Sequence, residues 1–179
     1  MSIRLTQIFG RRVLASPSSD AEDLPLRPST EAVPHDLIEL LFFAYRDFVG
    51  DPDRILADYG FGRAHHRVLH FVQRRPGLTI AELLDILQIT KQSLARVLKQ
   101  LIEMGYIRQM AGAKDRRERR LYPTLAGREL ALALSEPQSR RITDAMRKLS
   151  PDGRSAVVSF LREMRGRDPN LQVLESELD

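Results

Sequence analysis

The sequence predicts a mainly α-helical fold with one small β-hairpin. Helix-capping residues followed by apolar residues at helical spacing recur along residues 34–166. Two short strand-like runs, 106–110 and 119–122, lie on either side of one charged loop. Hydrophobic residues make up 42% of the 179 residues, which is sufficient for a core of ordinary size.

The composition excludes several classes of protein and site. The chain has no cysteine, which rules out disulfide bonds, thiolate metal sites and cysteine nucleophiles. No apolar run approaches the roughly 20 residues of a membrane span, so we expect a cytoplasmic protein with no membrane partner. The 28 Lys and Arg against 24 Asp and Glu give a formal net charge of +4, which favours polyanionic partners.

The two ends of the chain differ in composition from its middle. Residues 1–33 combine prolines and serines with a group of arginines, Arg4, Arg11 and Arg12, that precedes an acidic stretch. This composition predicts a flexible N-terminal arm, whose arginines could add non-specific contacts to a polyanion. Residues 167–179 are predicted to form a C-terminal tail.

Residues 34–60 are predicted to form N-terminal helices. Nearly every residue from Leu37 to Val49 is apolar, more than the single stripe of a surface helix, so this helix needs burial on several sides. Asp51 and Pro52 have the pattern of an N-cap followed by proline in the first turn, which predicts that a second helix begins there. A Gly-Phe-Gly break follows.

Three further helical stretches come next, and two of them carry clear start signals. Thr79 and Glu82 form a capping box, in which the hydroxyl and the carboxylate satisfy amide hydrogens at the helix end. Thr90, one tight turn after that helix, is a second N-cap. The predicted helices span residues 63–74, 80–87 and 91–104.

The hairpin and a pair of C-terminal helices complete the predicted fold. Thr124 caps a helix rich in leucine and alanine, which Pro137 is expected to kink or split. Ser150, followed by proline, has the pattern of another helix start. Residues 124–166 are therefore predicted to form the C-terminal helices.

The segment 91–104 has two different faces. At 100° per residue its leucines and valine gather on one side, whereas Gln92, Arg96 and Lys99 lie opposite. Two short helices joined by a tight turn, the second basic on its outer face, form a helix-turn-helix, whose second helix reads base edges. The competing interpretation is an ordinary surface helix, whose polar face only contacts solvent and which has the same pattern. The candidate DNA contacts on this helix are Lys91, Gln92, Ser93, Arg96 and Lys99.

The hairpin adds positive charge. Between residues 114 and 120 there are five cationic and two anionic side chains, Asp115 and Glu118. A cationic loop of this kind can reach phosphates or the minor groove, so residues 61–123 are predicted to form a winged helix-turn-helix DNA-binding lobe. Its wing candidates are Lys114, Asp115, Arg116, Arg117 and Arg119.

These motifs resemble the MarR family of regulators. The resemblance rests on the capped helices, on Leu-Ile-Glu-Met-Gly-Tyr-Ile (101–107) and on Asp-x-Arg in the wing. It implies that Arg117 enters the minor groove while Asp115 orients the wing. The family's Leu-Thr-x-x-Gly motif after the wing reads Pro-Thr-Leu-Ala-Gly here, with Pro123 replacing leucine.

The resemblance also implies how such a protein works. Residues 34–60 and 124–166 would form a homodimer, and each lobe would bind half of a pseudo-palindromic operator in double-stranded DNA. The protein would repress transcription, and a small-molecule effector, often aromatic or phenolic, would lower its DNA affinity. No cofactor is expected.

Aromatic and histidine side chains on the first two helical stretches offer a lining for such an effector. Packing in a dimer core is the competing interpretation for the aromatic residues. His66 and His70, spaced i and i+4, could be a metal-ligand pair, but further ligands from His35, Glu39, Asp47 or a partner chain would be needed, so no metal is predicted. Acid sensitivity of DNA binding is another interpretation. The candidate ligand-binding residues are Phe43, Tyr45, Phe61, His65, His66 and Leu69.

Other classes of function fit the sequence less well. An enzyme is not expected, because the chain has neither a glycine-rich phosphate loop nor a G-x-S-x-G motif. A winged-helix adaptor that binds protein remains an alternative, against which the basic wing argues. An architectural DNA binder of low specificity is the other alternative.

Overall fold

The structure is a computed structural model that describes residues 34–112 and 117–165. The predicted arm (1–33), the predicted tail (167–179) and Lys114, Asp115 and Arg116 of the wing lie outside the described residues. Contacts divide the chain into two units, Met1–His35 and Asp36–Asp179. The second unit holds all but the first residues of the described chain.

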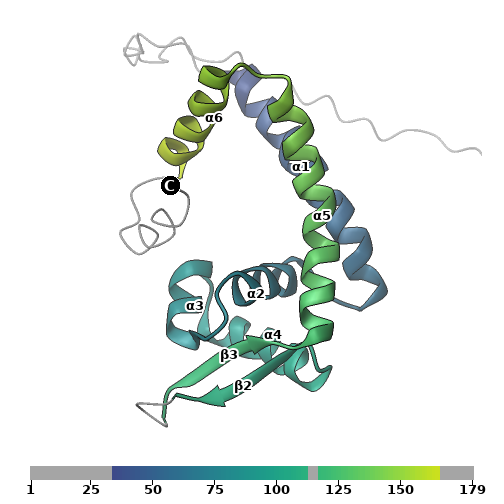
Figure 1. Cartoon of the computed structure of the whole chain (residues 1–179), viewed down its shortest axis with the longest axis vertical. Helices are drawn as coiled ribbons and strands as arrows, with labels where there is room; N and C mark the ends of the chain where they lie inside the picture. The colour runs from purple at the N-terminus through teal and green to yellow at the C-terminus, as the bar shows by residue number, and fades with distance from the viewer. Residues whose placement is uncertain (1–33, 113–116, 166–179) are drawn as a thin grey trace, which may run out of the picture. The chain divides into compact units, whose positions relative to one another are not determined.

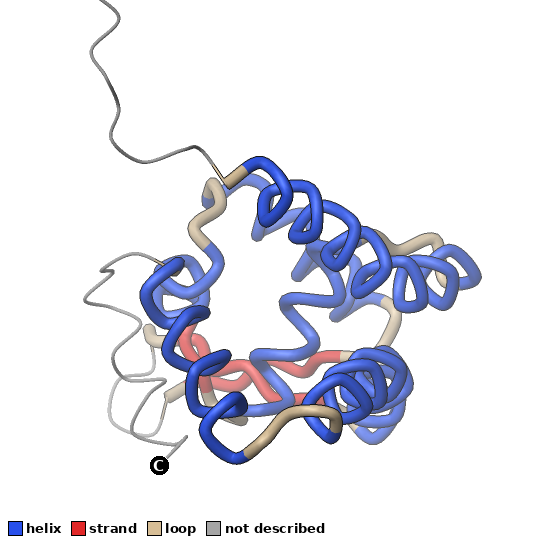
Figure 2. The backbone as a smooth tube through the Cα atoms, turned by 90° about the horizontal axis from the view of Figure 1, so that it is seen from above, coloured by secondary structure: helices blue, strands red, loops and turns tan. Residues whose placement is uncertain are grey.

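The described chain is mostly helical and contains one small antiparallel sheet (Figure 1), as the sequence predicts. The strands lie in the order β1-β3-β2, and Figure 2 shows the three of them together in red. The two-residue strand β1 was not predicted, and it pairs Leu78 with Leu121 of β3. In order, the elements are α1 (His35–Asp58), α2 (Arg63–Arg74), β1 (Leu78–Thr79), α3 (Ile80–Leu87), α4 (Lys91–Glu103), β2 (Ile107–Ala111), β3 (Arg119–Pro123), α5 (Leu125–Arg147) and α6 (Pro151–Met164).

The core lies where α2, α3 and α4 pack against the sheet and the first half of α5. One face of each helix is buried, at Val68 in α2, Leu83 in α3 and Leu94 in α4, each of which is fully covered. Burying a leucine or valine side chain stabilises a fold by roughly 1.5–3 kcal/mol, so these faces hold the helix-turn-helix in place. Leu121 of β3 and Leu134 of α5 close the same cluster.

The helix α1 corrects one prediction. A second helix does not begin at Asp51, because α1 continues through Pro52 to Asp58. Proline has no amide hydrogen, so the carbonyl of Phe48 one turn earlier loses its helical partner. The Nε2 of Gln138 in α5 donates to that carbonyl at 3.2 Å, which replaces the missing bond. Likewise α5 is not split at Pro137.

Much of the apolar surface of α1, α5 and α6 is exposed in the single chain. Phe42 is 66% exposed and Leu161 54% exposed, and α6 has no buried residue. Within the described segments, no helix is long and apolar enough to cross a membrane. The large exposed apolar side chains of these helices include Leu37, Leu40, Leu41, Phe42, Phe43, Tyr45, Leu132, Ile142, Val158, Phe160, Leu161 and Met164.

Candidate nucleic-acid interface

A tight turn joins α3 to α4. Gln88 ends α3 in the left-handed conformation, with φ 50° and ψ 44°, which reverses the chain within two residues. Its amide donates to the carbonyl of Leu84 at 2.9 Å, and its Nε2 donates to the carbonyl of Asp85 at 2.6 Å. Thr90 then caps α4, because its Oγ1 accepts from the amide of Ser93 at 3.2 Å.

This geometry presents one face of α4 to solvent. Leu94, Leu98 and Leu101 are buried on the opposite face, which fixes the rotation of the helix. The exposed face carries amide, guanidinium and ammonium groups, the types that pair with base edges and phosphates. All five candidate contacts on this helix are exposed: Lys91, Gln92, Ser93, Arg96 and Lys99.

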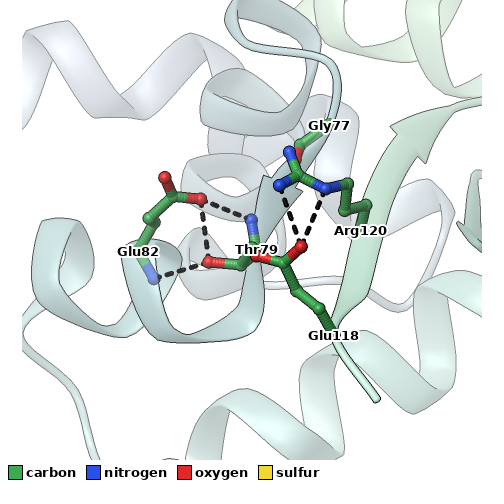
Figure 3. A network of polar contacts seen from close by, with 5 residues as sticks. All are labelled: Gly77, Thr79, Glu82, Glu118 and Arg120. Carbon is green, nitrogen blue, oxygen red and sulfur yellow. Dashed lines mark hydrogen bonds and ion pairs between the residues drawn. The ribbon is translucent and has the colours of Figure 1, made fainter. Parts of the chain in front are cut away.

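The arginines of the wing lie in two different environments. Arg117 and Arg119 are exposed. Arg120, in contrast, is half-buried, and it donates from Nε and Nη2 to Glu118 at 3.1 and 2.9 Å and from Nη1 to the carbonyl of Gly77 at 3.2 Å (Figure 3). Arg120 therefore holds the base of the hairpin against the segment before α3, a role that a count of charges could not reveal.

The N-terminus of α3 lies beside this network. The carboxylate of Glu82 accepts from the amide of Thr79 at 2.7 Å and from its hydroxyl at 2.8 Å (Figure 3), so the predicted capping box is confirmed. The hydrogen bonds from the Thr79 backbone and then its hydroxyl lower the pKa of Glu82. The box thus keeps Glu82 ionised where the helix dipole favours negative charge.

Two polar contacts connect α2 to the helix-turn-helix. His65 accepts from the amide of Gly62 at Nδ1, at 3.1 Å, so its Nε2 carries the proton and donates to Gln100 of α4 at 2.9 Å. The ring also stacks on Phe61, with centroids 4.6 Å apart. Arg67 donates from Nη2 to the carbonyl of Leu87, at the end of α3, at 2.8 Å.

A pocket of about 440 Å³ lies between α1, α2 and α5. Of the six predicted ligand-binding residues, Tyr45 and His66 line it. Phe61 and Leu69 do not, because both are buried in the core, and His65 contacts α4 instead. Phe43 is exposed on α1. The residues that sequence reasoning missed are Phe48, Val49, Asp53, Arg63, Arg67, His70, Phe71 and Gln138.

The polar side of this pocket is organised by an ion pair. Arg63 donates to Asp53 from Nε at 3.0 Å and from Nη2 at 2.7 Å, and this contact raises the pKa of Arg63. Burial lowers the pKa values of His66 and His70 below the usual range, with a smaller contribution from nearby positive charge. Both rings are therefore neutral near pH 7, which suits hydrogen bonding to a ligand.

A metal site finds no support in the described residues. None of their His, Asp and Glu side chains form a group of three or more that could hold an ion. His66 and His70 thus have no described third ligand, and the candidates His35, Glu39 and Asp47 do not complete a site with them.

A helix-turn-helix with an exposed basic second helix, followed by an antiparallel hairpin, defines a winged-helix DNA-binding protein. Residues 59–118 match the model of the MarR family. The HTH-type transcriptional regulator PetP of Rhodobacter capsulatus is 46% identical over 142 residues, which cover 79% of this chain and 78% of PetP. The chain therefore belongs to the MarR family of transcriptional regulators and is not an enzyme.

Solved structures share the fold. The crystal structure of the transcriptional regulator SlyA matches with a TM-score of 0.60 at 20% identity, over 73% of this chain and 92% of that one. MarR matches with a TM-score of 0.57 at 22% identity, over 82% and 96%. A mutant of MarR from E. coli, complexed with operator DNA, matches with a TM-score of 0.55 at 17% identity, over 72% and 93%.

Proposed function

We propose that this protein is a homodimeric repressor that binds a pseudo-palindromic operator in double-stranded DNA and releases it when a small aromatic or phenolic anion binds. The observation that carries the proposal is the exposed polar and basic face of α4, held outward by the buried leucines behind it. Such a regulator would act in the cytoplasm, where it meets the chromosome.

The recognition helix α4 supplies the sequence-specific contacts in this proposal. Lys91, Gln92 and Ser93 lie in its first turn, the part of a recognition helix that reaches base edges. Arg96 follows one turn later on the same exposed side. Arginine and lysine pair with guanine O6 and N7, and glutamine pairs with adenine N6 and N7, so these side chains can specify a sequence.

The wing supplies contacts to the DNA backbone or the minor groove. Arg119 begins β3 with an exposed side chain, and Arg117 is exposed just before it. Contacts of this type add affinity on every sequence and make binding dependent on salt. Lys114, Asp115 and Arg116 remain wing candidates from the sequence.

Dimerisation through the regions 34–60 and 124–166 is supported by exposed apolar surface. Monomeric soluble proteins rarely leave large contiguous apolar patches exposed. Here, the first half of α1 and the whole of α6 present leucine and phenylalanine side chains to solvent in the single chain. A second copy of the chain would bury them.

The pocket between α1, α2 and α5 supports the response to a ligand. Phe48, Val49 and Phe71 provide apolar contacts, while Arg63, Arg67 and the neutral imidazoles provide polar ones. A volume of about 440 Å³ lies within the range of small-molecule sites. An aromatic body with one acidic group matches both sides of this lining.

The test is a titration of the full chain with fluorescent duplexes selected by the protein from a random-sequence pool. We expect nanomolar binding to a selected inverted-repeat duplex, and this binding should survive an excess of random duplex. The ratio of the affinities for the selected and the random duplex should depend only modestly on salt. Equal, steeply salt-dependent binding to every duplex would instead indicate an architectural protein. No binding to any duplex would favour a protein-binding adaptor.

A further inference from the structure

Arg67 contacts both the pocket and the turn of the helix-turn-helix. It stands in the middle of α2, and its side chain lines the pocket beside His66 and His70. Its Nη2 reaches beyond the pocket and donates to the carbonyl of Leu87 at 2.8 Å. Leu87 is the last residue of α3 and directly precedes Gln88, whose left-handed conformation turns the chain toward α4.

The bond to Leu87 matters because helix ends leave carbonyls without helical partners. Two carbonyls near the end of α3, those of Leu84 and Asp85, accept from the backbone and side chain of Gln88. The carbonyl of Leu87 accepts from Arg67 on a different helix. A cation at a helix C-terminus also stabilises the helix through its dipole. Arg67 therefore fixes the end of α3, and with it the turn, against α2.

The arrangement of charges in the pocket would allow an anionic ligand to compete with the carbonyl of Leu87 for the Arg67 guanidinium. The carboxylate of Asp53 is already engaged by Arg63, through two nitrogens of that guanidinium. Arg67, in contrast, donates to a neutral carbonyl, that of Leu87. A carboxylate can accept two parallel hydrogen bonds from a guanidinium, and such charge-assisted pairs are about twice as strong as neutral ones.

We infer that Arg67 couples the pocket to DNA binding: an aromatic carboxylate in the pocket takes the Arg67 guanidinium from Leu87, which loosens the turn before α4. The inference rests on the proposed function, since it assigns the mechanism by which the proposed effector lowers DNA affinity. Because coupling between two sites is reciprocal, DNA that holds the turn fixed weakens carboxylate binding by the same factor.

Hydrogen exchange of the full chain tests this without any DNA. Mass spectrometry follows the peptide 84–94, and a peptide from 125–134 in α5 reports whether the rest of the lobe stays folded. The ligand probes are benzoate and 4-hydroxybenzoate, with benzyl alcohol as the uncharged control, and calorimetry measures their binding. The variants are Arg67→Met, which removes the donors, and Arg74→Met, an exposed arginine of the same helix that does not line the pocket.

In the wild type, benzoate should speed exchange of 84–94 by about tenfold, the factor expected for loss of one charge-assisted hydrogen bond. Benzyl alcohol and Arg74→Met should leave this exchange unchanged. Arg67→Met should exchange about tenfold faster without ligand and should not respond further to benzoate. The 125–134 peptide should be unaffected throughout.

Three results would overturn the inference. The first is a hydrogen-exchange rate of peptide 84–94 in Arg67→Met that equals the rate in the wild type. The second is a response of that variant to benzoate as large as that of the wild type. The third is that neither carboxylate binds to the wild type. None of these measures DNA binding, so the repressor proposal fails or stands separately, in the duplex titration.

Discussion

Gly127 stands in the first turn of α5 at a point where two backbones nearly touch. A Cβ at this position would lie 2.0 Å from the carbonyl oxygen of Tyr106 and 2.9 Å from its carbonyl carbon. The approach is close because Thr124, which caps α5, donates from its amide to the same carbonyl at 3.0 Å. The glycine after the wing thus has a steric cause, independent of any backbone conformation that only glycine adopts.

We therefore expect Gly127→Ala to destabilise the protein, although alanine is the better helix former. Because the obstacle is backbone, the strain should cost about 1–3 kcal/mol in the free energy of unfolding, measured with urea. Gly50→Ala is the matched control, since a Cβ on this helical glycine in α1 meets nothing within 4 Å. It should stabilise the protein by about 0.5–1 kcal/mol. Equal effects of the two substitutions would contradict the steric argument.

His66 and His70 make stability depend on pH. Burial lowers the pKa of each ring in the folded chain, so between that lowered pKa and the ordinary 6.5 the unfolded chain binds more protons. Stability is therefore fully present above pH 6.5 and falls as the pH decreases through that window. The double variant His66→Gln/His70→Gln should lose this part of the dependence, measured as Tm between pH 7.5 and pH 5.

The control for the histidine pair is His35→Gln, at the exposed start of α1. It should keep the dependence of the wild type. If the double variant and His35→Gln have the same Tm profile as the wild type, the pair in the pocket does not carry the acid sensitivity.

At the scale of elements, substitutions in α4 and in the wing should weaken DNA binding in different ways. Arg96 lies on the exposed face of α4, so Arg96→Ala should cost about 1–3 kcal/mol on the selected duplex and little on random duplexes. Arg119 lies in the wing, so Arg119→Ala should weaken binding to all duplexes and reduce the salt slope by about one. Anisotropy titrations at two salt concentrations measure both quantities.

Arg140→Ala is the control for these two variants, because Arg140 pairs with Glu136 on α5, outside the helix-turn-helix and the wing. It should bind every duplex like the wild type. Uniform losses on all duplexes for both Arg96→Ala and Arg119→Ala would mean that α4 does not read bases.

The elements also differ in how well the sequence predicts them. The starts of α3, α4, α5 and α6 were predictable because a capping hydroxyl bonds an amide only three residues away. The passage of α1 through Pro52 was not, since the carbonyl of Phe48, which Pro52 cannot pair, accepts from a glutamine 90 residues after Phe48. Strand β1 is similar, because it is defined by its pairing with β3.

The candidate sites follow the same division. The exposed face of α4 could be predicted because helical spacing alone separates its two sides. The pocket could not, since α5 joins α1 and α2 there from a distant part of the sequence, and only Tyr45 and His66 of the predicted residues lie in its lining. The contacts of Arg67 and Arg120 with backbone carbonyls were likewise invisible, because a carbonyl partner leaves no trace in the sequence.

At the scale of the whole molecule, the exposed apolar surface argues that a single chain is incomplete. The last helix, α6, has no buried residue, yet Val157, Phe160 and Leu161 fall on one side of it at helical spacing. A short helix with one apolar face gains most of its stability from packing that face against protein. The described residues of the single chain provide no such burial for α6, which supports the proposed homodimer.

We expect the wild type to elute with twice the 20.4 kDa mass of one chain in size-exclusion chromatography with light scattering. Phe160→Glu/Leu161→Glu should shift it toward the monomer, because two carboxylates cannot be buried unpaired in an apolar interface. The monomer should also bind the selected duplex far more weakly, since two linked lobes benefit from a high effective concentration. Ser159→Glu adds a charge on the opposite side of α6 and should remain dimeric. A dimer that persists with both glutamates, or a monomeric wild type, would exclude α6 from the interface.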